Sequence, residues 1–442
     1  MNRKIYIPIL IVIFSAAIFY SYEGFSDIYD DRLFPKIEIT ALEDDISYVE
    51  LDKSWSYQRI NRRWTEEVNF PNTENVPGST GVEDVLDVAP VFSYNKSIEV
   101  SADKVPDRSV LIIREQTTET VKFQDIVNIQ ELPHPEMNGV FEYILTMEWT
   151  DETKQYRGQK TISFPIVLDF PENYQFSREE IIQGDILEIT VYYAGNPQDV
   201  FVEQSIFEEF RWFSQEGLLR GYIPTNYSTE PGVYQIRYGS KSAGTEYVKD
   251  IEVIAHEYRV QNLYIDENIE QQTRNEKAYA EFAKYFNPVR LQSAPVRYYT
   301  DSFIIPSKGR LTTEFGQTRY VNDAPTSYRH SGLDIAAPTG TDILATNSGK
   351  VVLAMPLILT GNTIVIDHGE GLFSVYFHNH ENFVEVGEMV ERGQLIGSVG
   401  TTGFSTGPHL HFTMSYYNMN LEPGFFLVGQ PITFANHREF LQ

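Results

Sequence analysis

Two short polar patterns near the C-terminal end of the sequence contain residue types that bind metal ions. The first is His330-Ser331-Gly332-Leu333-Asp334, and the second is His409-Leu410-His411. In a β-strand, residues two or four positions apart project from the same face, so His330 can pair with Asp334 and His409 with His411. A glycine inside the first pattern and a proline before the second disfavour helices. No Glu follows His330, which excludes the helical H-E-x-x-H pattern.

The ligand chemistry of this protein is limited to nitrogen and oxygen, because the sequence contains no cysteine and only nine histidines. His330, Asp334 and one of the two histidines of the second pattern supply three ligands. Three ligands of this kind leave a fourth position on a zinc ion for water, which is typical of a catalytic site. Bound water then ionises near neutral pH, and the remaining histidines can carry protons or donate to an oxyanion. The patterns therefore predict one Zn2+ ion and hydrolytic chemistry.

The histidines are concentrated in one region, since six of the nine lie between residues 330 and 411. An isolated histidine is more often a structural residue than a ligand, and His134, His256 and His437 are interpreted in that way. His368 lies at the end of an expected strand, where a structural hydrogen bond is the better interpretation. Tyr376 is expected to pack its ring in the core.

Short strands must position these side chains. Gly-punctuated segments follow residue 298, among them GKVVLAM, NTIVIDHG, LFSVYFH, GQLIGSVG and HLHFTMS. Period-two segments also recur between residues 91 and 257, and those from 174 onward fit a small Ig-like sandwich. Residues 266–285 lack Pro and Gly and favour a helix. The fold class is therefore mainly β: N-terminal β-sandwich-like domains, a helical linker and a C-terminal antiparallel β-sheet domain.

Five segments follow from these patterns. They are 1–22, a signal peptide or membrane anchor; 23–173, an acidic β-rich domain; 174–257, an Ig-like β-sandwich; 258–297, a linker with a helix; and 298–442, the domain with the metal-binding patterns. A length of 442 residues agrees with several domains, at about 150 residues each.

The net charge of −27 excludes a role in nucleic-acid binding, which needs clustered Lys and Arg to displace counterions. The first residues, in contrast, place Arg3 and Lys4 before an apolar run at residues 5–20, which is typical of an export signal. Because this run is longer than a usual signal core and shorter than a usual span, both cleavage and membrane anchoring through residues 5–20 remain open. We expect an exported protein, periplasmic or on the cell surface.

The C-terminal part resembles the lysostaphin/LytM-type zinc metallopeptidases, whose motifs H-x-x-x-D, Tyr-x-His and H-x-H are all present in order. The resemblance extends over residues 301–428, about 30% of the chain, through segments such as YRHSGLDIAAPTGTDILA, VYFH and VERGQLIGSVGTTGFSTGPHLHF. Two positions depart from the family pattern. Asn379 stands where Leu is usual, and Thr413 stands where Glu is frequent.

The resemblance implies that His330, Asp334 and His411 bind zinc and that His378 and His409 are the catalytic histidines. It also implies an antiparallel β-sheet fold with an open groove, and a zinc metalloendopeptidase that hydrolyses peptide bonds in peptidoglycan, in cross-links or stem peptides. The alternative is a non-catalytic wall-binding adaptor that regulates another wall hydrolase, as in relatives that have lost metal ligands.

Overall fold

The computed structural model describes residues 37–440, except 42–43, 46–48, 62–63, 71–90, 93–97, 136, 152–155, 195–196, 216–217, 265–266 and 322–323. The chain divides into two compact units, Met1–Pro171 and Glu172–Gln442. The predicted signal or anchor at residues 1–22 lies outside the described residues. Within the described residues, no helix is both long enough and apolar enough to cross a bilayer.

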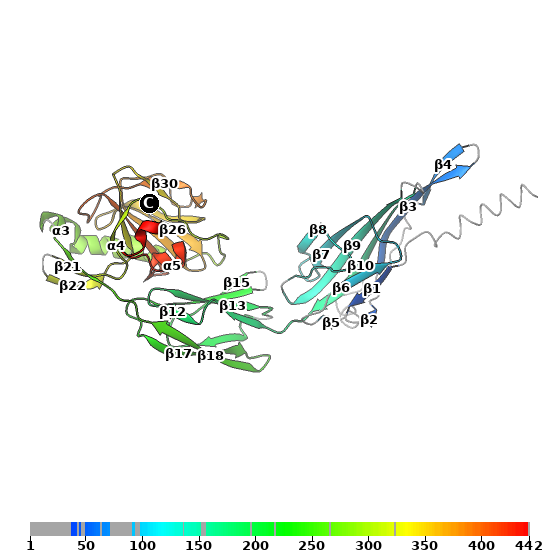
Figure 1. Cartoon of the computed structure of the whole chain (residues 1–442), viewed down its shortest axis with the longest axis horizontal. Helices are drawn as coiled ribbons and strands as arrows, with labels where there is room; N and C mark the ends of the chain where they lie inside the picture. Colours follow the sequence, from blue (N-terminus) through cyan, green and yellow to red (C-terminus); the bar gives the residue numbers. More distant parts are fainter. Residues whose placement is uncertain are drawn as a thin grey trace, which may run out of the picture. The chain divides into compact units, whose positions relative to one another are not determined.

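The first unit is built on long antiparallel strands (Figure 1). Its larger sheet has the order β4-β3-β10-β9-β7-β8, and β5 pairs with β10; a second sheet has the order β2-β1-β6. β9 and β10 form a hairpin, because they pair antiparallel from end to end. Alternate residues of β9, such as Phe141, Tyr143 and Leu145, are buried, as a strand with one face on a core requires. The strand bounds are β1 Ile37–Ala41, β2 Asp44–Asp45, β3 Val49–Asn61, β4 Trp64–Phe70, β5 Val91–Phe92, β6 Ile98–Ala102, β7 Arg108–Glu115, β8 Val121–Ile126, β9 Gly139–Asp151 and β10 Tyr156–Leu168.

The second unit begins with a sandwich of two four-stranded sheets, of order β11-β13-β16-β15 and β12-β18-β17-β14. Its core consists of aliphatic side chains from both sheets, including Leu187, Ile189, Ile223, Ile236 and Ile251. Most strands therefore follow the alternating pattern expected from the sequence. The bounds are β11 Asn173–Phe176, β12 Glu180–Ile182, β13 Ile186–Tyr192, β14 Val200–Glu203, β15 Trp212–Gln215, β16 Leu218–Pro224, β17 Gly232–Ser240 and β18 Thr245–Ile254.

The segment after the sandwich is part of the C-terminal fold. Strand β19 (Val260–Leu263) pairs in parallel with β21 (Thr318–Val321), which pairs with β22 (Ala324–Arg329). The helix predicted at 266–285 is two helices, α3 (Glu267–Thr273) and α4 (Glu276–Val289). Asn275 separates them because its side chain accepts a hydrogen bond from the backbone N–H of Ala278 and caps α4. Helix α4 packs against β25 (Gly349–Leu357).

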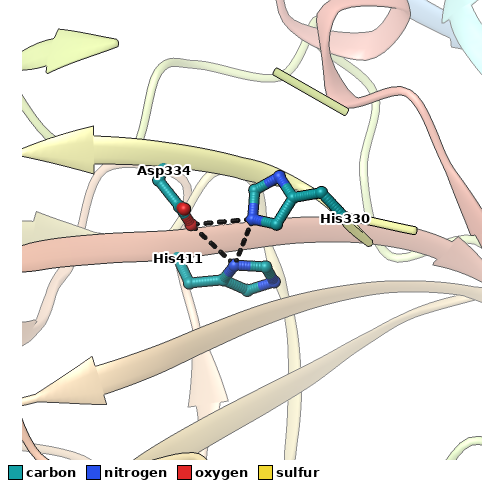
Figure 2. A group of neighbouring side chains, drawn as sticks. All are labelled: His330, Asp334 and His411. Carbon is teal, nitrogen blue, oxygen red and sulfur yellow. Dashed lines mark hydrogen bonds and ion pairs between the residues drawn. The ribbon is translucent and has the colours of Figure 1, made fainter. Parts of the chain in front are cut away.

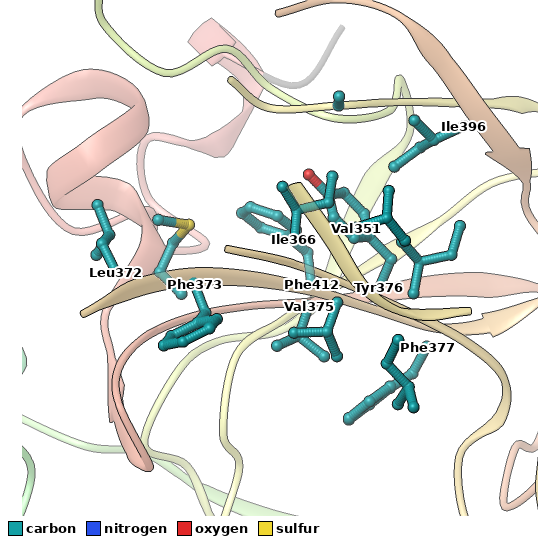
Figure 3. Close-up of a cluster of buried hydrophobic side chains, with 14 of the residues drawn as sticks. Val351, Ile366, Leu372, Phe373, Val375, Tyr376, Phe377, Ile396 and Phe412 are labelled. Atoms are coloured by element: carbon teal, nitrogen blue, oxygen red, sulfur yellow. The ribbon is translucent and has the colours of Figure 1, made fainter. Parts of the chain in front are cut away.

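The C-terminal domain is an antiparallel sheet of order β20-β23-β31-β27-β26-β25-β29, with β32 on β31 and a small second sheet β24-β30-β28. Its core gathers aromatic and branched side chains from β25, β26, β27 and β31, among them Val351, Ile366, Phe373 and Phe412 (Figure 3). Every residue of β27 is buried, so this strand lies at the centre of the domain. The bounds not yet given are β20 Arg310–Thr313, β23 Leu333–Ala336, β24 Asp342–Leu344, β26 Gly361–Gly369, β27 Leu372–Asn379, β28 Glu381–Asn382, β29 Met389–Val390, β30 Leu395–Ser398, β31 His409–Tyr416, β32 Met419–Leu421, α5 Pro423–Val428 and α6 His437–Phe440.

A buried carboxylate joins the sandwich to the C-terminal domain. Glu370, after β26, accepts hydrogen bonds from Arg220 at 2.9 Å, from Arg297 at 3.2 Å and from the hydroxyl of Tyr222. Glu370 is 2% exposed. The ring of Tyr222 also lies 5.6 Å from that of Tyr416 on β31. Tyr222 and Phe213 of the sandwich therefore pack into the core of the C-terminal sheet within the second unit.

Candidate active site

Three of the predicted side chains meet at the pairing of β23 with β31 (Figure 2). Asp334 of β23 lies directly opposite His411 of β31 in the strand register. An oxygen of Asp334, Oδ1, is 2.9 Å from Nε2 of His330 and 2.8 Å from Nδ1 of His411, and the two ring nitrogens are 3.0 Å apart. These three atoms form the group in the described chain that could hold a metal ion.

The path of the chain at His330 differs from the prediction. His330 was expected to share a strand with Asp334, but β22 ends at Arg329 and β23 begins at Leu333, so His330 lies in the connection. It still reaches the site because its backbone N–H donates to the carbonyl of Gln317 and its carbonyl accepts from Gly316. The even spacing thus indicated the correct partner, Asp334, although the two residues do not share a strand. Backbone hydrogen bonds of the connecting segment place His330 instead.

The outer hydrogen bonds of the two rings orient their inner nitrogens. Nδ1 of His330 lies 2.9 Å from the carbonyl oxygen of Glu314, which can only accept, so Nδ1 carries the proton and Nε2 has a lone pair. Nε2 of His411 lies 3.0 Å from the hydroxyl of Ser331 and 3.1 Å from that of Thr413, which leaves Nδ1 to face Asp334. With Nε2 of His411 protonated, two ring lone pairs and a carboxylate converge, an arrangement that suits a cation.

The charge of the site favours a cation as well. Burial alone would raise the pKa of Asp334, but His330 and His411 beside it hold that pKa well below its usual value. The carboxylate is therefore ionised at neutral pH. Atoms that form a triangle with sides of 2.8–3.0 Å lie about 1.7 Å from its centre, so one ion at the usual zinc distance of about 2.0–2.2 Å can contact all three. The donor set fits zinc.

His378 and His409 lie side by side next to this cluster, with ring centroids 4.8 Å apart. His378 donates from Nδ1 to the carbonyl of Thr402 at 2.8 Å, and His409 donates from Nδ1 to the carbonyl of Gly407 at 2.8 Å. Both therefore keep Nε2 as a proton acceptor, and in His409 this atom is 3.7 Å from Oδ1 of Asp334. Burial, followed by the neighbouring histidines, lowers the pKa of His378 well below 6.5, so its ring is neutral at neutral pH.

His378 has a left-handed backbone, with φ at 64°, at a register shift between β26 and β27. A residue other than glycine rarely adopts this conformation, and such residues cluster at functional sites. The irregularity lies at the residue that the motif Tyr-x-His singles out.

Four of the five side chains line one cavity of about 730 Å³. His330 lies behind the wall, whereas Asp334, His378, His409 and His411 line it. The remaining lining residues are Gln261, Arg274, Tyr279, Phe282, Thr312, Thr313, Ser331, Ala336, Leu359, Thr360, Phe377, Phe404, Ser405, Thr406, Gly407 and Pro408. Four of these, from Gln261 to Phe282, come from the segment interpreted as a linker.

Sequence reasoning missed the groups that hold the site in place. The carbonyl oxygens of Glu314 and Thr402 have no sequence signature, and Thr413 was noted only as a departure from a family pattern. Two other interpretations are confirmed: His368 is buried and donates to the carbonyl of Ser348 at 2.7 Å, and Tyr376 is buried in the core.

Comparison with known proteins finds relatives of part of this chain. Residues 328–423 match the model of peptidase family M23. An uncharacterized metalloprotease of Buchnera aphidicola is 30% identical over 38% of this chain and 45% of its own length. The peptidoglycan DD-endopeptidase ShyA of Vibrio cholerae is 37% identical over 28% of each chain. Among solved structures, the catalytic domain of lysostaphin from Staphylococcus simulans is 31% identical over 26% of this chain and 89% of that chain, with a TM-score of 0.24.

The matched region spans less than half the length of these two curated relatives. The matched residues 328–423 include His330, Asp334 and His411. The chain thus carries a peptidase domain of family M23 at its C-terminal end, which confirms the predicted resemblance and the mainly β fold class.

Proposed function

We propose that this protein is a zinc-dependent endopeptidase that hydrolyses peptide bonds in bacterial peptidoglycan. The observation that carries the proposal is the convergence of His330, Asp334 and His411, three donors that fit one zinc ion, beside two histidines with available Nε2 atoms. Relatives named as peptidoglycan DD-endopeptidases support the substrate class. The action would take place outside the cytoplasm, where peptidoglycan lies.

In this mechanism His330, Asp334 and His411 hold the ion, which when bound supplies Lewis acidity and an acidic water. His378 accepts a proton at Nε2, because its Nδ1 is held by the carbonyl of Thr402. His409, held in the same way by Gly407, accepts or returns a proton and, once protonated, donates to a negative oxygen of the substrate.

The test is digestion of purified peptidoglycan by the full-length chain, with the released fragments weighed by mass spectrometry. We expect cleavage within the peptides, lost with a chelator, restored by zinc and lost in His411→Ala. Circular dichroism of the variant checks that it folds. Cleavage that persists in this variant or under chelation contradicts the proposal.

Metal content separates this function from the adaptor alternative. A hydrolase retains about one zinc per chain, whereas a pure adaptor need not. The described chain keeps all five side chains that the family resemblance requires, so no specific observation favours the adaptor.

A further inference from the structure

Helix α4 supplies part of one wall of the active-site cavity, although it precedes the matched peptidase region of residues 328–423. Its residues Tyr279 and Phe282 both line the cavity. They lie three positions apart, so they project from the same face of the helix. Tyr279 is 48% exposed, and its ring is therefore accessible to a molecule that enters the cavity.

Contacts with the peptidase domain hold α4 in this position. The carboxylate of Glu281 accepts a hydrogen bond of 2.6 Å from the backbone N–H of Ile358. The ring of Phe282 stacks on that of Phe286 at 4.2 Å, and Phe286 in turn lies 5.3 Å from the ring of Phe377. Because both polar and apolar contacts fix the helix, this wall is preorganised for binding.

The cavity surface that adjoins α4 is largely apolar. Leu359, Phe377 and Phe404 line the cavity together with the two rings of the helix. The carbonyl of Leu359 accepts a hydrogen bond of 2.8 Å from the backbone N–H of Phe404, which ties together the two loops that carry these side chains. The ring of Phe377 lies 5.2 Å from that of His411. The apolar surface thus begins beside the His-Asp-His cluster, where the residues next to a scissile bond must lie.

The hydroxyl of Tyr279 is available to a ligand, because it has no hydrogen-bond partner within the part of the chain that the structure describes. Tyrosine combines a large apolar ring with a polar tip. A peptide offers both matching groups, an apolar side chain for the ring and a main-chain carbonyl that accepts a hydrogen bond. Tyr279 is therefore suited to bind a peptide that lies along the cavity.

We propose that Tyr279 is a substrate-binding residue. With Phe282 it forms a subsite for an uncharged, apolar side chain of the peptide beside the scissile bond, and its hydroxyl donates a hydrogen bond to the peptide main chain. This inference rests on the proposed peptidase function. It assigns substrate binding to a helix that precedes the matched family region.

The experiment measures steady-state cleavage of synthetic cross-linked wall peptides by the full-length chain. Tyr279→Ala should raise KM about tenfold and leave kcat nearly unchanged, because the ring contributes to binding rather than to the chemical step. Tyr279→Phe keeps the ring and loses only the hydroxyl, so KM should rise about threefold.

Pairs of peptides then locate the subsite. The two members of a pair differ only in whether the residue on one side of the cleaved bond is alanine or glycine, and each side is tested in turn. On one side the wild type should cleave the alanine form with a KM about fourfold lower, as expected for one buried carbon. Tyr279→Ala should lose most of this preference.

Tyr285→Ala is the matched control, since Tyr285 is 38% exposed on the same helix and does not line the cavity. It should keep the KM of the wild type. Zinc content and unfolding temperature check each variant, and if Tyr279→Ala loses zinc, Tyr279→Phe decides the test.

The outcomes separate this inference from the function on which it rests. If the wild type cleaves none of the peptides, the proposed function fails and the inference fails with it. If the wild type cleaves them and Tyr279→Ala has the same KM, or Tyr285→Ala raises KM equally, the role of Tyr279 is refuted. A wild-type KM in Tyr279→Phe refutes the hydrogen bond.

Discussion

The proposed ligand His411 is supported by a stack of aromatic rings that begins in α4. The ring of Phe377 lies 5.2 Å from that of His411, nearly parallel at 11°, and Phe286 packs behind it at 5.3 Å. The guanidinium of Arg290, itself 5% exposed, lies 4.2 Å from the ring centroid of Phe286. We predict that Phe286→Ala weakens both the fold and the metal site.

Two magnitudes follow from this stack. Replacing a buried Phe by Ala costs about 3–5 kcal/mol of stability, and Phe286 is only 3% exposed. An aromatic pair contributes about 0.5–1.5 kcal/mol beyond its burial, so loss of the support behind Phe377 should lower zinc affinity by roughly two- to tenfold. Urea unfolding measures the first effect, and competition with a chromophoric chelator measures the second.

Phe303→Ala is the control, because Phe303 is a buried ring of the same core, 6% exposed, whose ring contacts are with residues other than the ligands. It should lose similar stability and keep its zinc affinity. If both variants bind zinc equally well, or both lose the same affinity, the stack does not position His411 and the reasoning is refuted.

Three further predictions follow from single groups. Thr413→Val removes a hydroxyl partner of the ligand His411 and should lower zinc affinity about tenfold in a chelator titration, whereas an unchanged affinity would show that Ser331 suffices. Burial lowers the pKa of His368 to about 4, so its contribution to stability is present above pH 6.5 and is lost as the pH falls toward 4; the urea midpoint should drop over this range, and less in His368→Gln. Glu370→Gln leaves two partly buried arginines without their carboxylate and should cost about 3 kcal/mol, and a loss below about 1 kcal/mol would contradict this role.

The His-Asp-His cluster could be predicted from the sequence because its three residues lie in two short patterns. His409 and His411 alternate along β31, and the register places Asp334 opposite His411. The strands of the C-terminal domain could also be predicted from the sequence, since their apolar runs end at glycines. Long-range pairing remained hidden: no local pattern indicates that β19 joins β21 or that the carbonyl of Glu314 holds His330.

For residues 258–297 the sequence indicated a helix but not its contacts. Its composition predicted a helix correctly, but amphipathic spacing does not specify which surface a helix covers. Asn275 interrupts it because a side-chain oxygen can replace a backbone acceptor, which propensity alone does not indicate. The role of this segment in the cavity depends on contacts with residues such as Phe377, about 90 positions away in the sequence.

The parallel pairing of β19 with β21 has a consequence for protein engineering. A graft of the catalytic module that starts at residue 298 would cut away a strand of a three-stranded sheet, expose an unpaired edge and uncover the apolar face beneath α4. A chimera joined at the boundary between Pro171 and Glu172 keeps β19 paired with β21 and keeps α4 on its apolar face. The part of the chain to transfer is therefore the whole second unit, Glu172–Gln442, which is considerably longer than the matched region of residues 328–423.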